Sequence, residues 1–324
     1  MSLSHKKIVY MGTPDFAVEP LRRLIDGGYE VVGVVTTPDR EAGRGRNISM
    51  SAVKKYAVEA RLLVLQPESL KDDTFLASLR NLSPDIIVVV AFRMLPRVVW
   101  SMPPCGTFNL HASLLPDYRG AAPINRSLMN GDTVTGVTTF MLDAKIDTGE
   151  VILQRKVDIE PDDCAGTLHD KLMCAGADLV VETVDMIEQG RLVTRKQSEA
   201  SDPMRKEAPK IFKETCMIDW SATARQIHNH VRGLSPYPGA WSPLGDIAGK
   251  GNTFKIFVTR PIEKKHDYPC GTLLSNMKDS LWVAVSDGFI AIEQLQLSGK
   301  RRVTVAEYIR GAHLQGKVIV TDEI

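Results

Sequence analysis

Residues 1–189 alternate short apolar runs with segments of helical periodicity, and this alternation leaves few folds open. The apolar runs predict strands at residues 7–11, 30–36, 62–65, 85–91, 106–110, 135–141 and 150–157, and the segments between and after them predict helices at residues 16–25, 51–60, 71–82, 123–129 and 167–188. Strands that alternate with helices indicate βαβ units and a parallel sheet. The run Val88-Val89-Val90 is typical of a strand covered on both faces. The predicted fold class is therefore α/β, with a Rossmann-like, mostly parallel sheet domain.

The start of the chain lacks the glycine pattern of a dinucleotide site. The first strand leads into Gly12-Thr-Pro-Asp-Phe, with Thr13 as a candidate helix N-cap and Pro14 at the first helical position. A Gly-x-Gly-x-x-Gly motif, which brings the backbone close to a pyrophosphate, is missing at this turn. The sequence therefore disfavours NAD binding.

A second, smaller domain follows a polar segment. The predicted domains are a catalytic domain at residues 1–189, a linker at 190–210 and a C-terminal domain at 211–324. The last of these has one predicted helix and several short strands of alternating pattern, near residues 254–259, 271–274, 281–285, 289–297 and 318–320. Closely spaced short strands favour a small β-barrel, and the OB-fold is one kind of such barrel.

Charge is divided unevenly along the chain. Residues 1–204 carry a formal net charge of −4 and residues 205–324 one of +5, within a total of +1. A basic C-terminal part favours a polyanionic partner such as nucleic acid, although the same excess is also found on plain solvated surfaces.

Composition argues against disulfide-linked, zinc-binding and membrane-spanning proteins. The five cysteines form an odd set without a Cys-x-x-Cys pair, so neither a disulfide framework nor a zinc site is expected, and no metal is predicted. No apolar run approaches the length of about 20 residues that a bilayer requires. We expect a cytoplasmic protein without a membrane partner, and a monomer because no heptad pattern stands out.

The stretch Thr107 to Gly120 is the strongest candidate for chemistry. Its strand carries Asn109 and runs into His111, and two residues separated by one position on a strand face the same side. An amide N–H and a protonated imidazole are both donors that can stabilise a developing oxyanion. Asp147, in the loop after another apolar strand, is the best candidate for the carboxylate that orients the imidazole. The alternative is that Asn109 caps a turn and His111 is an ordinary hydrogen-bonded loop residue.

Two further segments have the composition of binding sites. Arg40, Arg44 and Arg46 lie in a loop loosened by two glycines, and guanidinium groups on such a loop suit phosphates and base edges. A solvated flexible loop is the other interpretation. The segment Phe92, Arg93 and Met94 follows the strand at residues 85–91, beside the Asn109 strand, and is predicted to line a ligand pocket.

These motifs together resemble a known family. Asn109-Leu-His-Ala-Ser-Leu-Leu-Pro, Arg119-Gly-Ala-Ala-Pro-Ile and Asp147-Thr-Gly are similar to the folate-dependent formyltransferases. The arginine loop and the C-terminal Ile218-Asp-Trp and Pro236-Tyr-Pro-Gly-Ala extend the resemblance over nearly the whole chain, to the branch that acts on methionyl-tRNA. One departure is visible, because that family commonly has Ala-Tyr-Gly where this chain has Ala91-Phe-Arg.

The resemblance implies a reaction and a role for each segment. A formyl group would pass from 10-formyltetrahydrofolate, as cosubstrate, to the α-amino group of methionyl initiator tRNA, giving the formylated tRNA of translation initiation. It assigns catalysis to Asn109, His111 and Asp147, and tRNA binding to the arginine loop. It places the folate against Ser113, Leu114, Leu115 and Pro116 and against the backbone at residues 92–94.

Two other interpretations stay open at the sequence level. The same formyl-transfer chemistry fits an amino sugar or glycinamide ribonucleotide as the acceptor. A different class of protein, a tRNA-binding module on an inactive domain, would have no need of the set Asn109, His111 and Asp147.

Overall fold

The computed structural model of the chain describes residues 5–42, 47–197, 205–243, 253–311 and 318–321. Their contacts divide them into two units. The first comprises residues 1–120, 134–158 and 169–207, and the second residues 121–133, 159–168 and 208–324. A mixed α/β unit and a second sheet unit confirm the predicted fold class.

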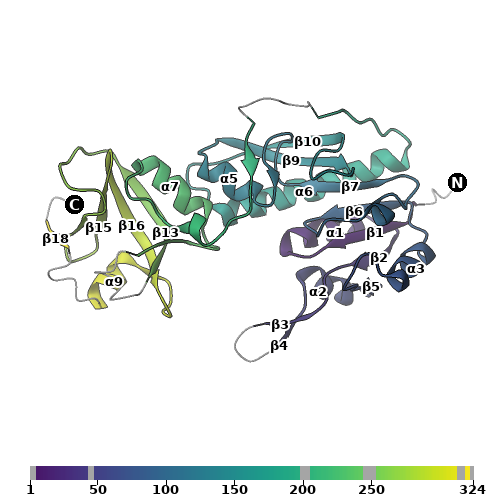
Figure 1. The fold of residues 1–324 in the computed structure, drawn as a ribbon, viewed down its shortest axis with the longest axis horizontal. Helices are drawn as coiled ribbons and strands as arrows, with labels where there is room; N and C mark the ends of the chain where they lie inside the picture. The colour runs from purple at the N-terminus through teal and green to yellow at the C-terminus, as the bar shows by residue number, and fades with distance from the viewer. Residues whose placement is uncertain (1–4, 43–46, 198–204, 244–252, 312–317, 322–324) are drawn as a thin grey trace. The chain divides into compact units, whose positions relative to one another are not determined.

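Seven strands form the sheet of the first unit, in the order β10-β9-β7-β6-β1-β2-β5 (Figure 1). The parallel strands are β1 (Ile8–Gly12), β2 (Val31–Val35), β5 (Val64–Leu65), β6 (Ile86–Val90) and β7 (Thr107–His111). The strands β9 (Val134–Met141) and β10 (Val151–Asp158) continue the sheet in antiparallel pairing. The sheet is therefore mostly parallel, as predicted.

Helices cover both faces of this sheet. The helical elements are η1 (Asp15–Ala17), α1 (Val18–Asp26), α2 (Ala52–Glu59), α3 (Asp73–Asn81), α4 (Arg97–Trp100) and α6 (Ala165–Glu188). On one face, Phe75 of α3 and Val99 of α4 pack in one core cluster with Val89 of β6. On the opposite face, a Cβ added at Gly176 of α6 would lie 2.7 Å from Leu110 Cδ2, so this glycine lets α6 close on β7.

Strand register fixes the direction of the candidate catalytic residues. Asn109 pairs with Val89 of β6 and with Phe140 of β9, and His111 pairs with Thr138. Paired residues face the same side of a sheet, and side chains alternate along a strand. Asn109 and His111 therefore lie on the face covered by α3 and α4, opposite to α6.

Two segments expected to lack regular structure contain some. In the predicted arginine loop, β3 (Arg40–Ala42) pairs with β4 (Asn47–Ser49) in an antiparallel hairpin, and residues 43–46 lie outside the described residues. In the predicted linker, Arg195 and Val151 exchange two backbone hydrogen bonds of 2.9 and 2.8 Å. The two-residue strands β8 (Arg119–Gly120) and β11 (Glu207–Ala208) lie near the ends of segments of the first unit.

The second unit is built on a mostly antiparallel sheet. Its strands are β12 (Ala240–Ser242), β13 (Phe254–Ile262), β14 (Leu273–Ser275), β15 (Leu281–Val285), β16 (Gly288–Leu297), β17 (Val303–Thr304) and β18 (Ile319–Val320). The order is β12-β13-β16-β15-β14-β18, with β17 paired to β16. Among the described residues the end strands β12 and β18 are not paired to each other, so hydrogen bonds do not close the barrel.

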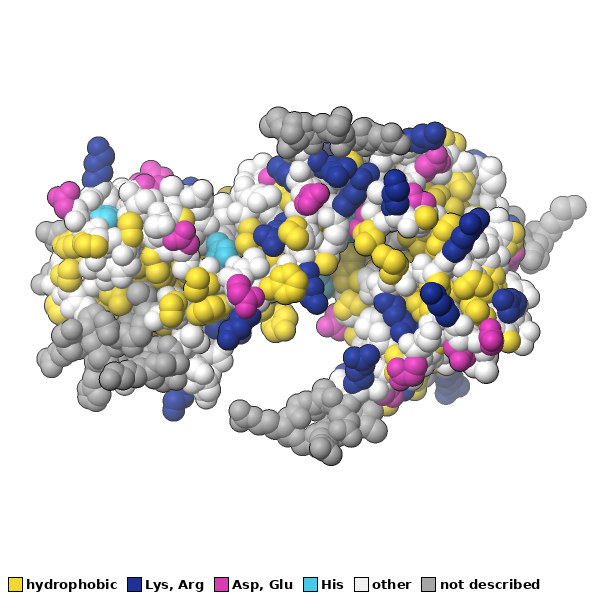
Figure 2. Space-filling view, viewed as in Figure 1, with side chains coloured by type: hydrophobic (Ala, Val, Ile, Leu, Met, Phe, Trp, Pro, Cys, Tyr) yellow, Lys and Arg dark blue, Asp and Glu magenta, His cyan; other side chains and the backbone are white. Residues whose placement is uncertain are grey.

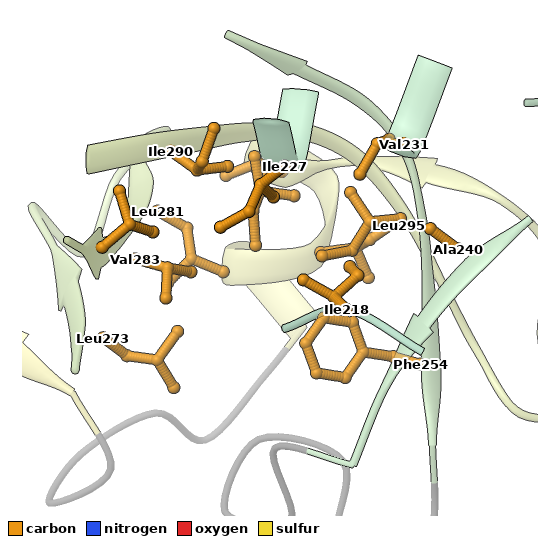
Figure 3. Packing of buried hydrophobic residues seen from close by; sticks show 14 of the residues in the cluster. Ile218, Ile227, Val231, Ala240, Phe254, Leu273, Leu281, Val283, Ile290 and Leu295 are labelled. Carbon is orange, nitrogen blue, oxygen red and sulfur yellow. The ribbon is translucent and has the colours of Figure 1, made fainter. Parts of the chain in front are cut away.

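The core of the second unit lies between this sheet and its helices, α7 (Ala224–Gly233) and α9 (Val305–Gly311). Ile227 and Val231 of α7 face Leu295 and Phe254 of the strands (Figure 3). A capping box between Thr223 and Gln226 starts α7. The 3-10 helix η2 (Glu214–Cys216) precedes α7, and its Cys216 is buried in the same cluster.

Helix α5 (Pro123–Met129) packs with the second unit, although the sequence analysis places it in the domain of residues 1–189. The physical reason is direct contact with α7. Asn125 Nδ2 donates to Gly233 O at 2.7 Å, and Met129 packs against the core of the second unit. Within the described ranges, none of the helices has the length and apolar character needed to cross a membrane.

Candidate active site

His111 is held by its own loop. The imidazole is buried, and Nε2 lies 2.8 Å from the carbonyl oxygen of Tyr118. Because a carbonyl can only accept, Nε2 carries the proton and donates it. The other ring nitrogen, Nδ1, lies 3.9 Å from Asp147 Oδ2, which is too long for a hydrogen bond but within reach of an ion pair when the ring is protonated. Tyr118 therefore sets the ring orientation, and Nδ1 faces the carboxylate.

Asp147 reaches His111 through a loop that turns back. The loop leaves β9 where Leu142 N–H donates to Thr107 O at 2.8 Å, at the end of β7 opposite to His111. Asp147 has a left-handed backbone with φ of 54°. Its Oδ2 accepts the Gly120 N–H at 2.9 Å, and the side chain is only 15% exposed. A partly shielded carboxylate is thus placed beside the imidazole.

Asn109 leaves a free donor on the same face. The residue is half-buried, and within the described ranges its side-chain amide has no hydrogen-bond partner. The amide N–H and the Nδ1 of a protonated His111 are therefore both available to an incoming oxygen. Two donors backed by a carboxylate form an arrangement that can stabilise a tetrahedral oxyanion and move a proton.

The segment Ser113–Pro116 is braced by two residues that the sequence analysis missed. Thr138 Oγ1 donates to Ser113 O at 2.6 Å and accepts from Leu115 N–H at 3.1 Å, and Gln154 Nε2 donates to Leu115 O at 2.8 Å. Leu114 packs closely on β9, because a Cβ at Gly136 would lie 2.5 Å from its Cδ2. The sequence offers no clear signal for them, because β9 also contains Thr135 and Thr139 and β10 continues after Gln154 with Arg155 and Lys156.

The segment after β6 presents its backbone and one exposed side chain. Phe92 packs against the α3 side core, and the Arg93 guanidinium donates to the carbonyls of Glu68, at 2.8 Å, and Pro67. Met94 is 70% exposed. Both terminal nitrogens of the Arg93 guanidinium are thus bonded to backbone carbonyls, whereas its buried Nε has no hydrogen-bond partner among the described residues.

Of the predicted tRNA-binding arginines, the structure places one. Arg40 begins β3 and is exposed, whereas Arg44 and Arg46 lie outside the described residues. On the face drawn in Figure 2, Lys and Arg side chains are scattered over both units, so charge alone does not mark a nucleic-acid surface on that face. The described part of the chain contains no group of three or more His, Cys, Asp or Glu side chains that could hold a metal.

Comparison with known proteins gives matches along nearly the whole chain. Residues 6–184 match the family model for formyl transferase, and residues 210–313 match that for the formyl transferase C-terminal domain. The chain is 53% identical to the methionyl-tRNA formyltransferase of Bacteroides fragilis, over 95% of each chain. It is 50% identical to that of Flavobacterium johnsoniae, over 94% of this chain and 96% of the relative.

Solved structures share the fold at low identity. A sugar 3N-formyl transferase, WlaRD, superposes with a TM-score of 0.65 at 19% identity, over 91% of this chain and 99% of that one. HypX from Aquifex aeolicus, in complex with tetrahydrofolic acid, superposes with a TM-score of 0.62 at 18% identity. That match covers 98% of this chain but spans about half, 49%, of the HypX chain. With both family models matched and relatives of this identity along nearly its whole length, the chain belongs to the formyl transferase family, within its methionyl-tRNA formyltransferases.

Proposed function

We propose that the chain transfers the formyl group of 10-formyltetrahydrofolate to the α-amino group of methionyl initiator tRNA. The observation that carries the proposal is the approach of Asp147 Oδ2 to His111 Nδ1, at 3.9 Å, together with the Asn109 amide, which has no hydrogen-bond partner among the described residues. The names of the relatives support the acceptor, and a neighbour solved with tetrahydrofolic acid supports a folate donor.

The proposed chemistry assigns one role to each side chain. The free amine attacks the formyl carbon, so a C–N bond forms and the carbonyl oxygen becomes negative. Asn109 Nδ2–H and His111 Nδ1–H donate to that oxygen, and loss of one such donor typically costs about 10²–10³ in rate. Asp147 faces the imidazole and accepts the proton that the attacking amine loses. The bond to N10 of the folate then breaks, and N10 takes a proton.

The binding segments complete the proposal. Ser113, Leu114, Leu115 and Pro116 hold the folate together with the backbone of residues 92–94, supported by the bracing of Thr138 and Gln154. Arg40, Arg44 and Arg46 contact the tRNA. We also propose that the protein acts as a monomer in the cytoplasm, where initiator tRNA is used.

Acceptor competition tests this proposal. Purified protein is given 10-formyltetrahydrofolate with equal concentrations of methionyl initiator tRNA, a nucleotide-linked amino sugar and glycinamide ribonucleotide. We expect formylation of the tRNA alone. Formylation of either small amine in preference to the tRNA would contradict the proposed acceptor while leaving the chemistry intact.

A further inference from the structure

A buried glutamine links two loops of the active site. Gln197 is 8% exposed, and its Nε2 donates to the carbonyl of Asp147 at 3.0 Å and to that of Gly149 at 2.8 Å. Its Oε1 accepts from Arg119, with Nε at 3.1 Å and Nη2 at 2.5 Å. Both N–H groups and the oxygen of this amide are therefore used, by residues 48 to 78 positions away in the chain.

Gln197 is itself anchored. Two residues earlier, Arg195 is paired with Val151 at the start of β10 by two backbone hydrogen bonds. Because β10 is part of the central sheet, this pairing ties the chain just before Gln197 to that sheet. The segment expected as a linker thus contributes to the site.

The hydrogen bonds of Gln197 lie at a residue with an uncommon backbone conformation, Asp147. A non-glycine residue with a positive φ is uncommon and persists when its surroundings fix it. Two contacts fix Asp147: Gln197 on the backbone carbonyl, and Gly120 N–H on the carboxylate. Arg119, directly before Gly120, donates to the same glutamine, so Gln197 is joined to both segments that hold Asp147.

Charged groups surround the bond between Arg119 and Gln197. Burial and the nearby Arg205 lower the pKa of the Arg119 guanidinium, while Asp147 and Asp143 act against that shift. Arg119 bonds the neutral Gln197 amide at 2.5 Å. The Arg119 link therefore places a cationic group beside the Asp147 loop.

We propose that Gln197 is a positioning residue for formyl transfer, which holds Asp147 in its left-handed conformation so that the carboxylate faces His111 Nδ1. This role rests on the proposed function, because it acts through Asp147. Without the amide, the loop at residues 143–149 relaxes and the carboxylate moves from the imidazole. Small displacements of a catalytic group cost rate while the binding surfaces for both substrates remain intact.

A double-mutant cycle tests the proposal. Single-turnover formyl transfer is measured for the wild type, Gln197→Ala, Asp147→Ala and the double variant, with KM for folate and tRNA measured in parallel. We expect Gln197→Ala to lower the rate between about 10-fold and 100-fold with both KM values near those of the wild type. In the Asp147→Ala background, the same change should lower the rate by at most about twofold.

Two further variants test whether a loss of rate comes specifically from the N–H groups of Gln197. Gln197→Glu keeps the size and the Arg119 contact but, when ionised, has no N–H for the two carbonyls, so it should lose as much rate as Gln197→Ala. Gln296→Ala, which removes an amide-to-carbonyl bond to Lys300 in the second unit, serves as the matched control and should keep the wild-type rate. An equal loss from Gln197→Ala in both backgrounds, or no loss in the wild type, would overturn the proposal. Wild-type activity in Asp147→Ala alone would instead overturn the proposed role of Asp147.

Discussion

His111 Nδ1 and Asp147 Oδ2 lie 3.9 Å apart, although their segments leave neighbouring strands at opposite ends. The loop after β9 starts beside Thr107, the first residue of β7, and brings Asp147 to His111, the last residue of β7. A hydrogen bond from Gly120 N–H holds the carboxylate at that position. The closure of this loop therefore brings the two residues together. The sequence predicts which residues take part, but not that their side chains meet.

Removing the Asp147 carboxylate tests this relationship. We predict that Asp147→Ala lowers the rate of formyl transfer by about 10²-fold or more, because the site loses the carboxylate that faces the imidazole and accepts the proton of the attacking amine. Retention of initiator tRNA on a filter should stay near the wild-type level. Asp143→Asn, in the same exposed loop, keeps an oxygen for Lys145 N–H and should remain active. Loss of tRNA retention together with activity would show that Asp147 holds the fold instead.

The brace under the proposed folate segment is tested at Thr138, which is fully buried. We predict that Thr138→Val costs about 1–3 kcal/mol of unfolding free energy, because Leu115 N–H and Gln154 lose their acceptor. The KM for the folate should rise, while that for tRNA stays constant.

Thr139→Val is the matched control for this prediction. Thr139 points to the opposite face and is bonded to Thr183 at 2.8 Å. Its replacement should reduce stability, measured by urea unfolding, without changing the folate KM. Equal KM effects of the two variants would argue against a specific role of the Thr138 brace.

Much of the first unit follows from local sequence. Helix α5 is predicted at its observed bounds because Pro123 starts it, and β6 because a continuous apolar run fits a strand covered on both faces. The hairpin at β3 and β4 was not predicted, since glycines and arginines there have no strand pattern. Strand β12 was also missed, because its three residues follow the turn-rich Pro236-Tyr-Pro-Gly.

The supporting residues of the site depend on distant contacts. Asn109 and His111 could be found from their strand and loop, and Asp147 from the loop that follows a strand. Thr138 meets Ser113 across 25 positions, and Gln197 meets Asp147 across 50. Such pairings are set by register and loop closure, which no local pattern contains.

The proposed tRNA contact of the arginine loop predicts how the affinity for tRNA depends on salt. Arg40 is exposed at the start of β3, and a single phosphate contact by it should contribute about 0.7–0.9 to the slope of log affinity against log salt. We predict that Arg40→Ala weakens binding of methionyl initiator tRNA, reduces that slope by this amount and leaves the folate KM unchanged. Arg80→Ala, an exposed change in α3, is the control. An unchanged slope would exclude a phosphate contact by Arg40.

Stability in mild acid should depend on a histidine of α7. Burial, with Arg232 and Arg225 nearby, lowers the pKa of His228 to about 4 from an unfolded value of 6.5. The unfolded chain therefore takes up the proton first, so this stabilisation is complete above pH 6.5 and is lost as the pH falls towards 4. Between pH 6.5 and 5 we predict a loss of about 1.5 kcal/mol that His228→Gln does not show. Parallel pH profiles of unfolding for the two proteins would contradict the assignment.

The most direct test of the account is formyl transfer from 10-formyltetrahydrofolate to methionyl initiator tRNA, measured beside elongator tRNA carrying the same methionine. We predict transfer to the initiator alone, reduced by about 10²–10³ in Asn109→Ala, which removes one donor to the oxyanion. Equal transfer to both tRNAs, or an Asn109→Ala protein as fast as the wild type, would contradict it.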